Sequence, residues 1–193
     1  MTIHHLPLLT KTAQHTLIRE IQTLVLPESP LFTPTMKSGA KFHYQMTCCG
    51  ETGWISDTLG YRYTTLHPIT GKPWASLTPS LLTLIDYLKL QGYIPANYQA
   101  QTCLINKYLP GNKLGLHQDN SERNLTAPII SISLGASGIF QLGGLNRHDP
   151  IEEITLQPGD IFIMGEDDRL RFHGFKGILN GKKRVNLTIR QVY

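Results

Sequence analysis

The second half of the chain consists almost entirely of short β-prone runs, and this feature constrains the fold more than any other. After Ala100 the runs are separated by turn signals such as Pro110–Gly111, Pro158–Gly159 and Asn180–Gly181. The expected strands are Thr102–Tyr108, Leu114–His117, Ile129–Leu134, Gly138–Leu142, Ile151–Leu156, Ile161–Met164, Leu170–His173 and Arg184–Val192. A series of short strands at this spacing predicts a sandwich or a jelly roll.

The first half of the chain contains two predicted helices. They cover residues 11–26 and Pro79–Gln91, with Thr10 and Thr78 as candidate N-caps. The expected buried positions are Leu17, Ile18, Ile21, Leu24 and Val25 in the first helix and Leu81, Leu82, Ile85 and Leu88 in the second. Between the helices, residues 41–64 form short β-prone stretches broken by glycine turns.

The length of 193 residues suits one domain with a buried core and is too short for two of ordinary size. We therefore expect a single domain, with about residues 1–98 preceding a β core at about 99–193. No apolar run approaches the ~20 residues that span a bilayer, and the N-terminus lacks the pattern of a secretory signal. These features predict a cytoplasmic monomer with no membrane partner.

Charge and cysteine content limit the partners only loosely. A net charge of +4 permits a polyanionic partner such as nucleic acid without requiring one. The three cysteines, Cys48, Cys49 and Cys103, are an odd number and include an adjacent pair, so reduced thiols are expected. The adjacent pair also lacks the C-x₂₋₄-C spacing of structural zinc sites, and we assign the cysteines no function.

The motif His117-Gln118-Asp119 is the first candidate site. On an extended backbone residues i and i+2 point to the same face, so the imidazole and the carboxylate can bind one metal ion. His173, 54 residues after Asp119, is the candidate third ligand. Two histidines and one carboxylate leave positions open for O₂ and a chelating cosubstrate, as Fe(II) oxygenases require. A His-x-Asp pair is also common in proteins that bind no metal.

The last expected strand has one polar face. That face comprises Arg184, Asn186, Thr188 and Arg190. An edge strand with one solvated face gives the same alternation. However, arginines that follow the distal histidine also suit a dicarboxylate cosubstrate, because guanidinium groups form bidentate, charge-assisted bonds with carboxylates. Asn106 and Tyr108 form a further i, i+2 pair upstream of the metal motif, and both can donate hydrogen bonds to a carboxylate.

These motifs lie within longer stretches that resemble the AlkB family of nucleic-acid dealkylases, which are Fe(II)- and 2-oxoglutarate-dependent dioxygenases. The resemblance is carried by CLINKYLPGNKLGLHQDNSERNLTAPIISISLGASGIFQLGGLNRHDP, by GDIFIMGEDDRLRFHG and by RVNLTIRQ. It extends upstream through MTCCGETGW, GYRY and GKPW, and so covers roughly residues 40–193. It implies a mainly β, α+β fold, in which a double-stranded β-helix (jelly roll) core carries N-terminal helices and a nucleotide-recognition lid.

Carried over position by position, the resemblance implies three groups of site residues. The Fe(II) ligands are His117, Asp119 and His173, with Arg190 counted among the catalytic residues. The 2-oxoglutarate-binding residues are Arg184 for the distal carboxylate, Tyr108 and Asn186 beside it, and Asn106 and Arg190 near the chelating carboxylate. The substrate-binding residues are Met46, Trp54, Tyr61, Ser121 and Arg147. Trp54 and Tyr61 belong to the implied lid. The alternative is that both are aromatic residues of the hydrophobic core with no role in substrate binding.

The sequence departs from the family pattern at three places. Ser121 stands two positions after Asp119, where the well-known members carry an acidic residue. A carboxylate there accepts a hydrogen bond from an exocyclic amine, so the base preference of this chain is left open. The segment from His173 to Arg184 is shorter than in those members, and Met164 replaces an expected aromatic residue.

The activity implied is oxidative demethylation of N-alkylated bases such as 1-methyladenine and 3-methylcytosine, in repair of alkylation damage. It uses Fe(II), 2-oxoglutarate and O₂ and releases formaldehyde, succinate and CO₂. The implied partner is alkylated single- or double-stranded DNA, and RNA remains an alternative. A hydroxylase or demethylase of proteins or small molecules, and a jelly-roll module that binds without turnover, are the rival hypotheses. The nucleic-acid hypothesis expects one groove beside the metal that is lined by aromatic and basic residues. These residues are Trp54, Tyr61, Lys41, Arg62, Lys72 and Arg147.

Overall fold

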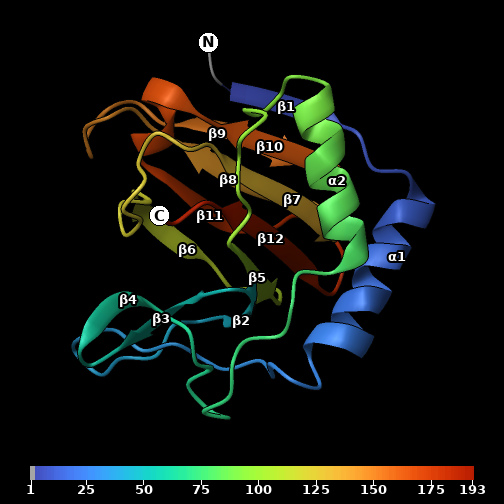
Figure 1. Ribbon diagram of the computed structural model, residues 1–193. Helices are drawn as coiled ribbons and strands as arrows, with labels where there is room; N and C mark the ends of the chain where they lie inside the picture. Colours follow the sequence, from blue (N-terminus) through green and yellow to red (C-terminus); the bar gives the residue numbers. More distant parts are fainter. Residues whose placement is uncertain (1–2) are drawn as a thin grey trace.

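The computed structural model describes residues 3–193, which form three antiparallel sheets and two α-helices (Figure 1). The strands are β1 (Ile3–Pro7), β2 (Gln45–Gly50), β3 (Gly53–Asp57), β4 (Gly60–Thr64), β5 (Thr102–Tyr108), β6 (Leu114–His117), β7 (Ile129–Gly135), β8 (Gly138–Leu142), β9 (Glu152–Leu156), β10 (Asp160–Met164), β11 (His173–Ile178) and β12 (Arg184–Arg190). The helices are α1 (Lys11–Glu20), continued by a π-helical turn (Ile21–Val25), α2 (Pro79–Leu90) and a 3₁₀ helix (Glu166–Leu170).

Two of the sheets form the predicted jelly-roll core. The six-stranded sheet has the order β1-β10-β7-β12-β5-β2, and the four-stranded sheet has the order β6-β11-β8-β9. From β5 onward the chain passes repeatedly between the two sheets, as a double-stranded β-helix requires. A cavity between them is lined by residues of both, such as Asn186 from β12 and Phe140 from β8. The mainly β, α+β prediction is therefore confirmed.

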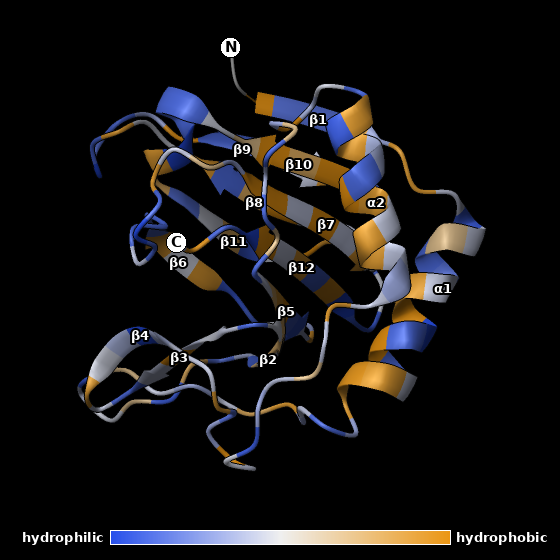
Figure 2. Ribbon diagram, viewed as in Figure 1, coloured by the Kyte–Doolittle hydropathy of each residue, from blue (hydrophilic) through white to orange (hydrophobic). Residues whose placement is uncertain are grey.

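Helices α1 and α2 cover the outer face of the six-stranded sheet, where Figure 2 shows apolar strand segments beside them. Leu17 from α1 and Leu81 from α2 belong to the same buried cluster as Ile130 from β7 and Leu187 from β12. Burial of each such side chain stabilises the fold by about 1.5–3 kcal/mol. Because strand side chains alternate, the same two strands direct polar residues to the opposite face, into the cavity between the sheets.

Two positions of the predicted helix stripes are wrong. Leu82 is 47% exposed, while Leu84 is buried in its place. The sheet contacts Leu81, Leu84, Ile85 and Leu88, and a residue directly after Leu81 is turned about 100° away from that stripe. Leu24 is 49% exposed because it lies in the π-helical turn, whose wider winding changes the phase of the buried face.

The two predicted N-caps differ. The Thr10 hydroxyl accepts a hydrogen bond from the backbone N–H of Ala13 over 3.2 Å, as expected of an N-cap. Thr78 occupies the N-cap position of α2 without a capping bond from its side chain. Glu20 of α1 substitutes for it, because its carboxylate accepts from the backbone N–H of Ser80 over 3.1 Å and from the Ser80 hydroxyl over 2.8 Å. This contact also joins the two helices.

The predicted strand Leu170–His173 is wrong. Leu170 ends the 3₁₀ helix, and the strand begins at His173 and runs to Ile178. Three acidic residues at positions 166–168 favour the first turn of a helix, which displaces the start of the strand. Strand β1 was not predicted; it pairs with β10 along Ile3–Pro7, where the exposed edge strand has only a short apolar pattern.

Hairpin β3–β4 projects beside the open end of the jelly roll (Figure 1). Its base rests on Trp74, because a Cβ added at Gly53 would lie 2.3 Å from the Trp74 ring.

All three cysteines are buried and free. No helix in residues 3–193 is both long enough and apolar enough to cross a membrane.

Candidate metal centre and its two cavities

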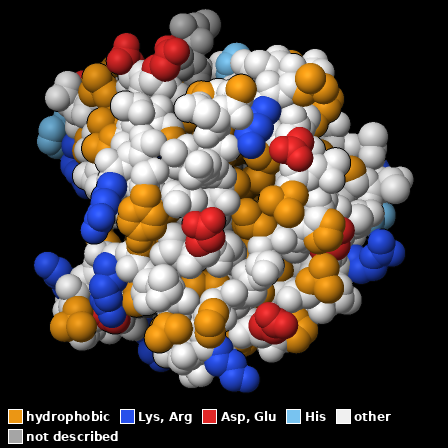
Figure 3. Space-filling model, in the orientation of Figure 1, with side chains coloured by type: hydrophobic (Ala, Val, Ile, Leu, Met, Phe, Trp, Pro, Cys, Tyr) orange, Lys and Arg blue, Asp and Glu red, His pale blue; other side chains and the backbone are white. Residues whose placement is uncertain are grey.

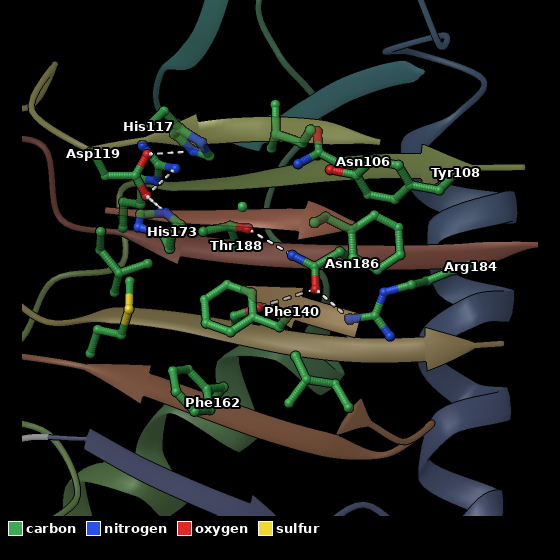
Figure 4. A pocket seen from close by; sticks show the side chains of 18 residues that line it. Asn106, Tyr108, His117, Asp119, Phe140, Phe162, His173, Arg184, Asn186 and Thr188 are labelled. Carbon is green, nitrogen blue, oxygen red and sulfur yellow. Dashed lines mark hydrogen bonds and ion pairs between the residues drawn. The ribbon is translucent and has the colours of Figure 1, made fainter. Parts of the chain in front are cut away.

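The predicted metal ligands His117, Asp119 and His173 converge at one end of the jelly roll (Figure 4). His117 ends β6 and His173 begins β11, and the antiparallel register makes the two residues direct partners. Asp119 Oδ1 lies 3.7 Å from His117 Nε2, and Asp119 Oδ2 lies 3.4 Å from His173 Nε2. The candidate ligand atoms all lie within 4.8 Å of one another, so one metal ion can contact all three side chains.

Both imidazoles are oriented with Nε2 towards the carboxylate. His117 Nδ1 lies 2.9 Å from the carbonyl oxygen of Gly115, and His173 Nδ1 lies 2.9 Å from that of Arg171. Because a carbonyl oxygen only accepts, each Nδ1 carries the proton and each Nε2 keeps a lone pair for a metal. Burial, together with the nearby His173, lowers the pKa of His117 to about 4, so that His117 is neutral at pH 7.

Asp119 is buried, and Arg190 keeps it charged. Arg190 lies at the end of β12, and its Nη2 donates to Asp119 Oδ2 over 2.8 Å. Burial raises the pKa of a carboxyl group, but the Arg190 guanidinium outweighs this effect and holds the pKa of Asp119 well below its usual value. Two neutral imidazoles and one carboxylate are the donor set that binds Fe(II) in oxygenases, so the residues present fit that metal.

The first cavity runs between the sheets from the metal ligands to Arg184 (Figure 4). Arg184 is 2% exposed, and its Nη2 donates to Ser133 Oγ over 2.7 Å and to Asn186 Oδ1 over 3.3 Å. Its hydrogen-bond partners among the described residues are all uncharged, and its Nε has none. Burial lowers the pKa of Arg184 to about 10, which leaves the group protonated at pH 7. A buried guanidinium without an acidic partner is suited to bind a carboxylate.

The other residues predicted to bind the cosubstrate lie along the same cavity. Asn106, Tyr108 and Asn186 line it, and Asn186 lies between Arg184 and the metal ligands in Figure 4. Asn186 accepts from Arg184 and donates to Thr188 Oγ1 over 3.0 Å. The Oδ1 atom of Asn106 is buried without a hydrogen-bond partner. Apolar side chains form the rest of the wall: Leu114, Ile129, Phe140, Leu156, Phe162, Met164 and Phe175. The cavity therefore has Arg184 at one end and the metal ligands at the other, with polar side chains of β12 along one side and apolar side chains around them. This arrangement suits a chelating dicarboxylate.

The second cavity adjoins the metal ligands on the side of hairpin β3–β4. Its volume is about 490 Å³, and His117, Asp119 and Arg190 contribute to its wall. All five residues predicted to bind substrate line this cavity: Met46, Trp54, Tyr61, Ser121 and Arg147. The structure therefore brings together residues that are as far as 101 positions apart in the sequence.

Two aromatic rings of the hairpin lie parallel at the edge of the second cavity. The ring centroids of Trp54 and Tyr61 are 5.5 Å apart with an interplanar angle of 28°. Tyr61 is 60% exposed, which excludes the alternative that it is a core residue. The basic residues Lys41, Arg62 and Lys72 do not line this cavity, and that part of the groove prediction is wrong. Arg62 instead forms a two-contact ion pair with Asp57 at 2.6 and 2.8 Å, within the hairpin.

Three residues beside the metal ligands were not predicted. Tyr63, Glu122 and Arg169 form a buried polar cluster with Arg190. A signal for Tyr63 was available, because strand alternation places it on the same face as Tyr61. No comparable signal exists for Arg169, which reaches the cluster from the 3₁₀ helix, an element that was not predicted.

Comparison with known proteins agrees with this geometry. Residues 2–190 match the model of the 2OG-Fe(II) oxygenase superfamily. The chain is 42% identical over 174 residues to the alpha-ketoglutarate-dependent dioxygenase AlkB of Salmonella typhimurium, with 86% of this chain and 80% of the relative covered. It is 40% identical to AlkB of Escherichia coli, with 93% and 85% covered. The solved structure of OsALKBH1 is similar with a TM-score of 0.81 and 28% identity, over 98% of each chain.

Proposed function

Because this chain belongs to the 2OG-Fe(II) oxygenase superfamily and, within it, to the AlkB family, we propose that it removes alkyl groups from nucleic-acid bases by oxidation. Its cofactors are Fe(II), 2-oxoglutarate and O₂. When bound, these supply the oxidation of an N-methyl group, which leaves as formaldehyde while 2-oxoglutarate becomes succinate and CO₂. The protein supplies the orientation of the reactants and a cavity that excludes water.

The first cavity is the site we assign to 2-oxoglutarate. Arg184 would bind the distal carboxylate, and Tyr108 and Asn186 would lie beside it. Asn106 and Arg190 would lie near the end that chelates iron, which His117, Asp119 and His173 hold. In this role Arg184 fixes how far the cosubstrate enters, and the apolar wall keeps bulk water from the iron.

The second cavity is the site we assign to the alkylated base, and it carries the proposal. It opens beside the metal ligands and ends at the Trp54 and Tyr61 rings, which offer flat surfaces for a base. A base in a duplex is inaccessible to such a site and would have to be flipped out or presented on a single strand. Methylation on the Watson–Crick edge weakens pairing, so 1-methyladenine and 3-methylcytosine are the favoured substrates.

DNA and RNA are both candidate polymers, because relatives of this chain are named as demethylases of each. One is called a DNA N(6)-methyladenine demethylase in Arabidopsis thaliana, and another a tRNA demethylase in Schizosaccharomyces pombe. Figure 3 shows Lys and Arg side chains on the side of the molecule that carries hairpin β3–β4. Positive charge there would attract a phosphate backbone of either type. We propose alkylated DNA as the principal substrate, in the repair of alkylation damage.

The test is formaldehyde release from methylated oligonucleotides incubated with Fe(II), 2-oxoglutarate and O₂. We expect release from single-stranded DNA that contains 1-methyladenine or 3-methylcytosine, and none from the unmethylated strand. The variant Asp119→Ala should be inactive because the carboxylate ligand is lost. A folded, iron-loaded protein that leaves both lesions intact in DNA and RNA would contradict the proposal. Succinate formation with a protein or small molecule as the substrate would then favour the rival hydroxylase hypothesis.

A further inference from the structure

Glu122 is at the centre of a buried polar cluster between the metal ligands and hairpin β3–β4. Its side chain is 0% exposed, and three side chains from separate elements donate to it. Arg190 from β12 and the Tyr63 hydroxyl from β4 both donate to Oε1, and Arg169 Nη2 donates to Oε2 over 3.0 Å. The two guanidinium groups balance the two carboxylates of Glu122 and Asp119, so the cluster buries no net charge.

One end of this cluster holds the metal ligand Asp119. Arg190 donates through one nitrogen to Glu122 and through another to Asp119 Oδ2. Arg169 donates to the backbone carbonyl of the same Asp119, and its Nε donates to the carbonyl of Ala127 over 2.9 Å. The backbone and the carboxylate of Asp119 are therefore both fixed by guanidinium groups that Glu122 orients. With Oδ2 bound to Arg190, Oδ1 is left free of protein hydrogen bonds.

The other end of the cluster holds the hairpin. Tyr63 is the register partner of Trp54, and alternation places Tyr61 and Tyr63 on the same face of β4. The Tyr63 hydroxyl donates to Glu122 and also accepts from Arg190 Nη1 over 3.3 Å. The hairpin that carries the base-facing rings is thus joined at Tyr63 to the metal ligand Asp119 through two side chains, Glu122 and Arg190.

We propose that Tyr63 and Glu122 are positioning residues that couple occupancy of the base cavity to metal binding. The inference rests on the proposed function, because it requires a base between the hairpin and the iron. A base that presses on Trp54 and Tyr61 stabilises the position of β4 in which Tyr63 reaches Glu122. That position in turn holds Arg190 against Asp119, which favours the bound metal. By thermodynamic linkage, a bound metal must favour base binding by the same factor.

The test measures oligonucleotide affinity with and without metal. Fluorescence anisotropy of single-stranded DNA containing 3-methylcytosine gives the affinity of the wild type with Mn(II) and 2-oxoglutarate, or with 2-oxoglutarate alone. We expect Mn(II) to strengthen binding of the wild type about fivefold or more. The variant Tyr63→Phe removes one hydroxyl and should lose most of that enhancement. Because a divalent cation also attracts phosphate by itself, the comparison between variants carries the result.

Tyr61→Phe is the matched control. It removes a hydroxyl from the same strand and the same face, but this hydroxyl is outside the Glu122 cluster. We expect Tyr61→Phe to keep the enhancement by Mn(II). Glu122→Gln preserves the side-chain volume and should weaken binding of Mn(II) alone about tenfold, measured by calorimetry. If Glu122→Gln fails to fold, Tyr63→Phe still decides the question.

Two results would overturn the inference while leaving the proposed function intact. In the first, the wild type binds the methylated strand equally well with and without Mn(II). In the second, Tyr63→Phe shows the same enhancement as Tyr61→Phe. A wild type that binds no methylated strand under any condition would instead contradict the proposed function, and the coupling with it.

Discussion

His117 and His173 are direct register partners on the neighbouring antiparallel strands β6 and β11, with ring centroids 4.5 Å apart. Each ring donates from Nδ1 to the carbonyl of the residue two positions earlier, over 2.9 Å in both cases. The strand pairing therefore fixes the separation of the rings, and the backbone fixes their tautomer. Two of the three metal ligands are set by the sheet before any metal binds.

We expect His173→Ala to abolish binding of Mn(II), used as a probe for the iron site, while the protein remains folded. The side chain supplies one of three ligands, and its loss leaves too few donors for a tight site. Calorimetry measures the affinity. In the wild type, metal at about 100 times its Kd should raise the free energy of unfolding by about 2.7 kcal/mol, and the variant should lose this gain. His148→Ala, at an exposed position, is the control; equal Mn(II) affinity in both variants would contradict the assignment.

We expect Arg184→Gln to raise the KM for 2-oxoglutarate about 100-fold, because a buried charge pair with the distal carboxylate is lost. Affinity for Mn(II) alone should change little, since Arg184 lies at the far end of the cavity from the metal ligands. Arg184→Lys keeps the charge without the bidentate geometry and should give an intermediate KM. Lys176→Gln, which removes a surface cation paired with Glu153, is the control. An unchanged KM in Arg184→Gln would show that the carboxylate binds elsewhere.

We expect Trp54→Ala to raise the KM for a methylated oligonucleotide about 10- to 100-fold, because stacking of one base contributes about 1–3 kcal/mol. The KM for 2-oxoglutarate should stay unchanged, since Trp54 lines only the second cavity. Steady-state kinetics of formaldehyde release with each substrate varied in turn measures both constants. Leu59→Ala changes a 79% exposed residue of the same hairpin outside the cavity and should behave as the wild type. A rise in both KM values would indicate a general loss of structure instead.

The polar residues that strand alternation places on one face could be predicted from the sequence. Arg184, Asn186 and Arg190 recur at every second or fourth position of β12, and the structure directs all three into the first cavity. In β12 the information is local, because the pleat of a single strand determines the direction of the side chain. The His-x-Asp spacing also identified two metal ligands, although β6 ends at His117 and Asp119 lies just beyond the strand.

The Glu122 cluster could not be predicted in this way. Arg169 contacts Glu122 only because the 3₁₀ helix before β11 folds back over the loop after β6. No periodicity in the sequence relates those two segments, which are 47 residues apart. The exposure of Leu82 has a similar origin, because the sheet determines which apolar stripe of α2 is buried. Leu24 is exposed because of the π-helical turn, which the sequence pattern did not indicate. Contacts made by tertiary packing require the structure.

His67 provides a pH-dependent support for the hairpin. It is 1% exposed; its Nε2 donates to the carbonyl of Pro30 over 2.8 Å, and its Nδ1 accepts from the backbone N–H groups of Ile69 and Thr70. Its ring also contacts Trp74, the residue on which Gly53 rests. Protonation of Nδ1 would break two hydrogen bonds. Burial accordingly lowers the pKa of His67 below 6.5, against a smaller opposing effect of the Pro30 carbonyl.

The unfolded chain therefore binds more protons at His67 than the native protein does when the pH is below about 6.5. The contribution of His67 to the free energy of unfolding must then fall as the pH decreases from about 6.5 through the lowered pKa of the native state. In His67→Gln this part of the pH dependence should disappear, so that urea denaturation at about pH 7.5 and about pH 5.5 gives a smaller difference than in the wild type. His15→Gln, at an exposed helix position, should keep the wild-type difference. An equal pH dependence in wild type and His67→Gln would mean that His67 is protonated as readily in the native protein as in the unfolded chain. Packing of Trp74 under the hairpin would then not depend on a neutral His67.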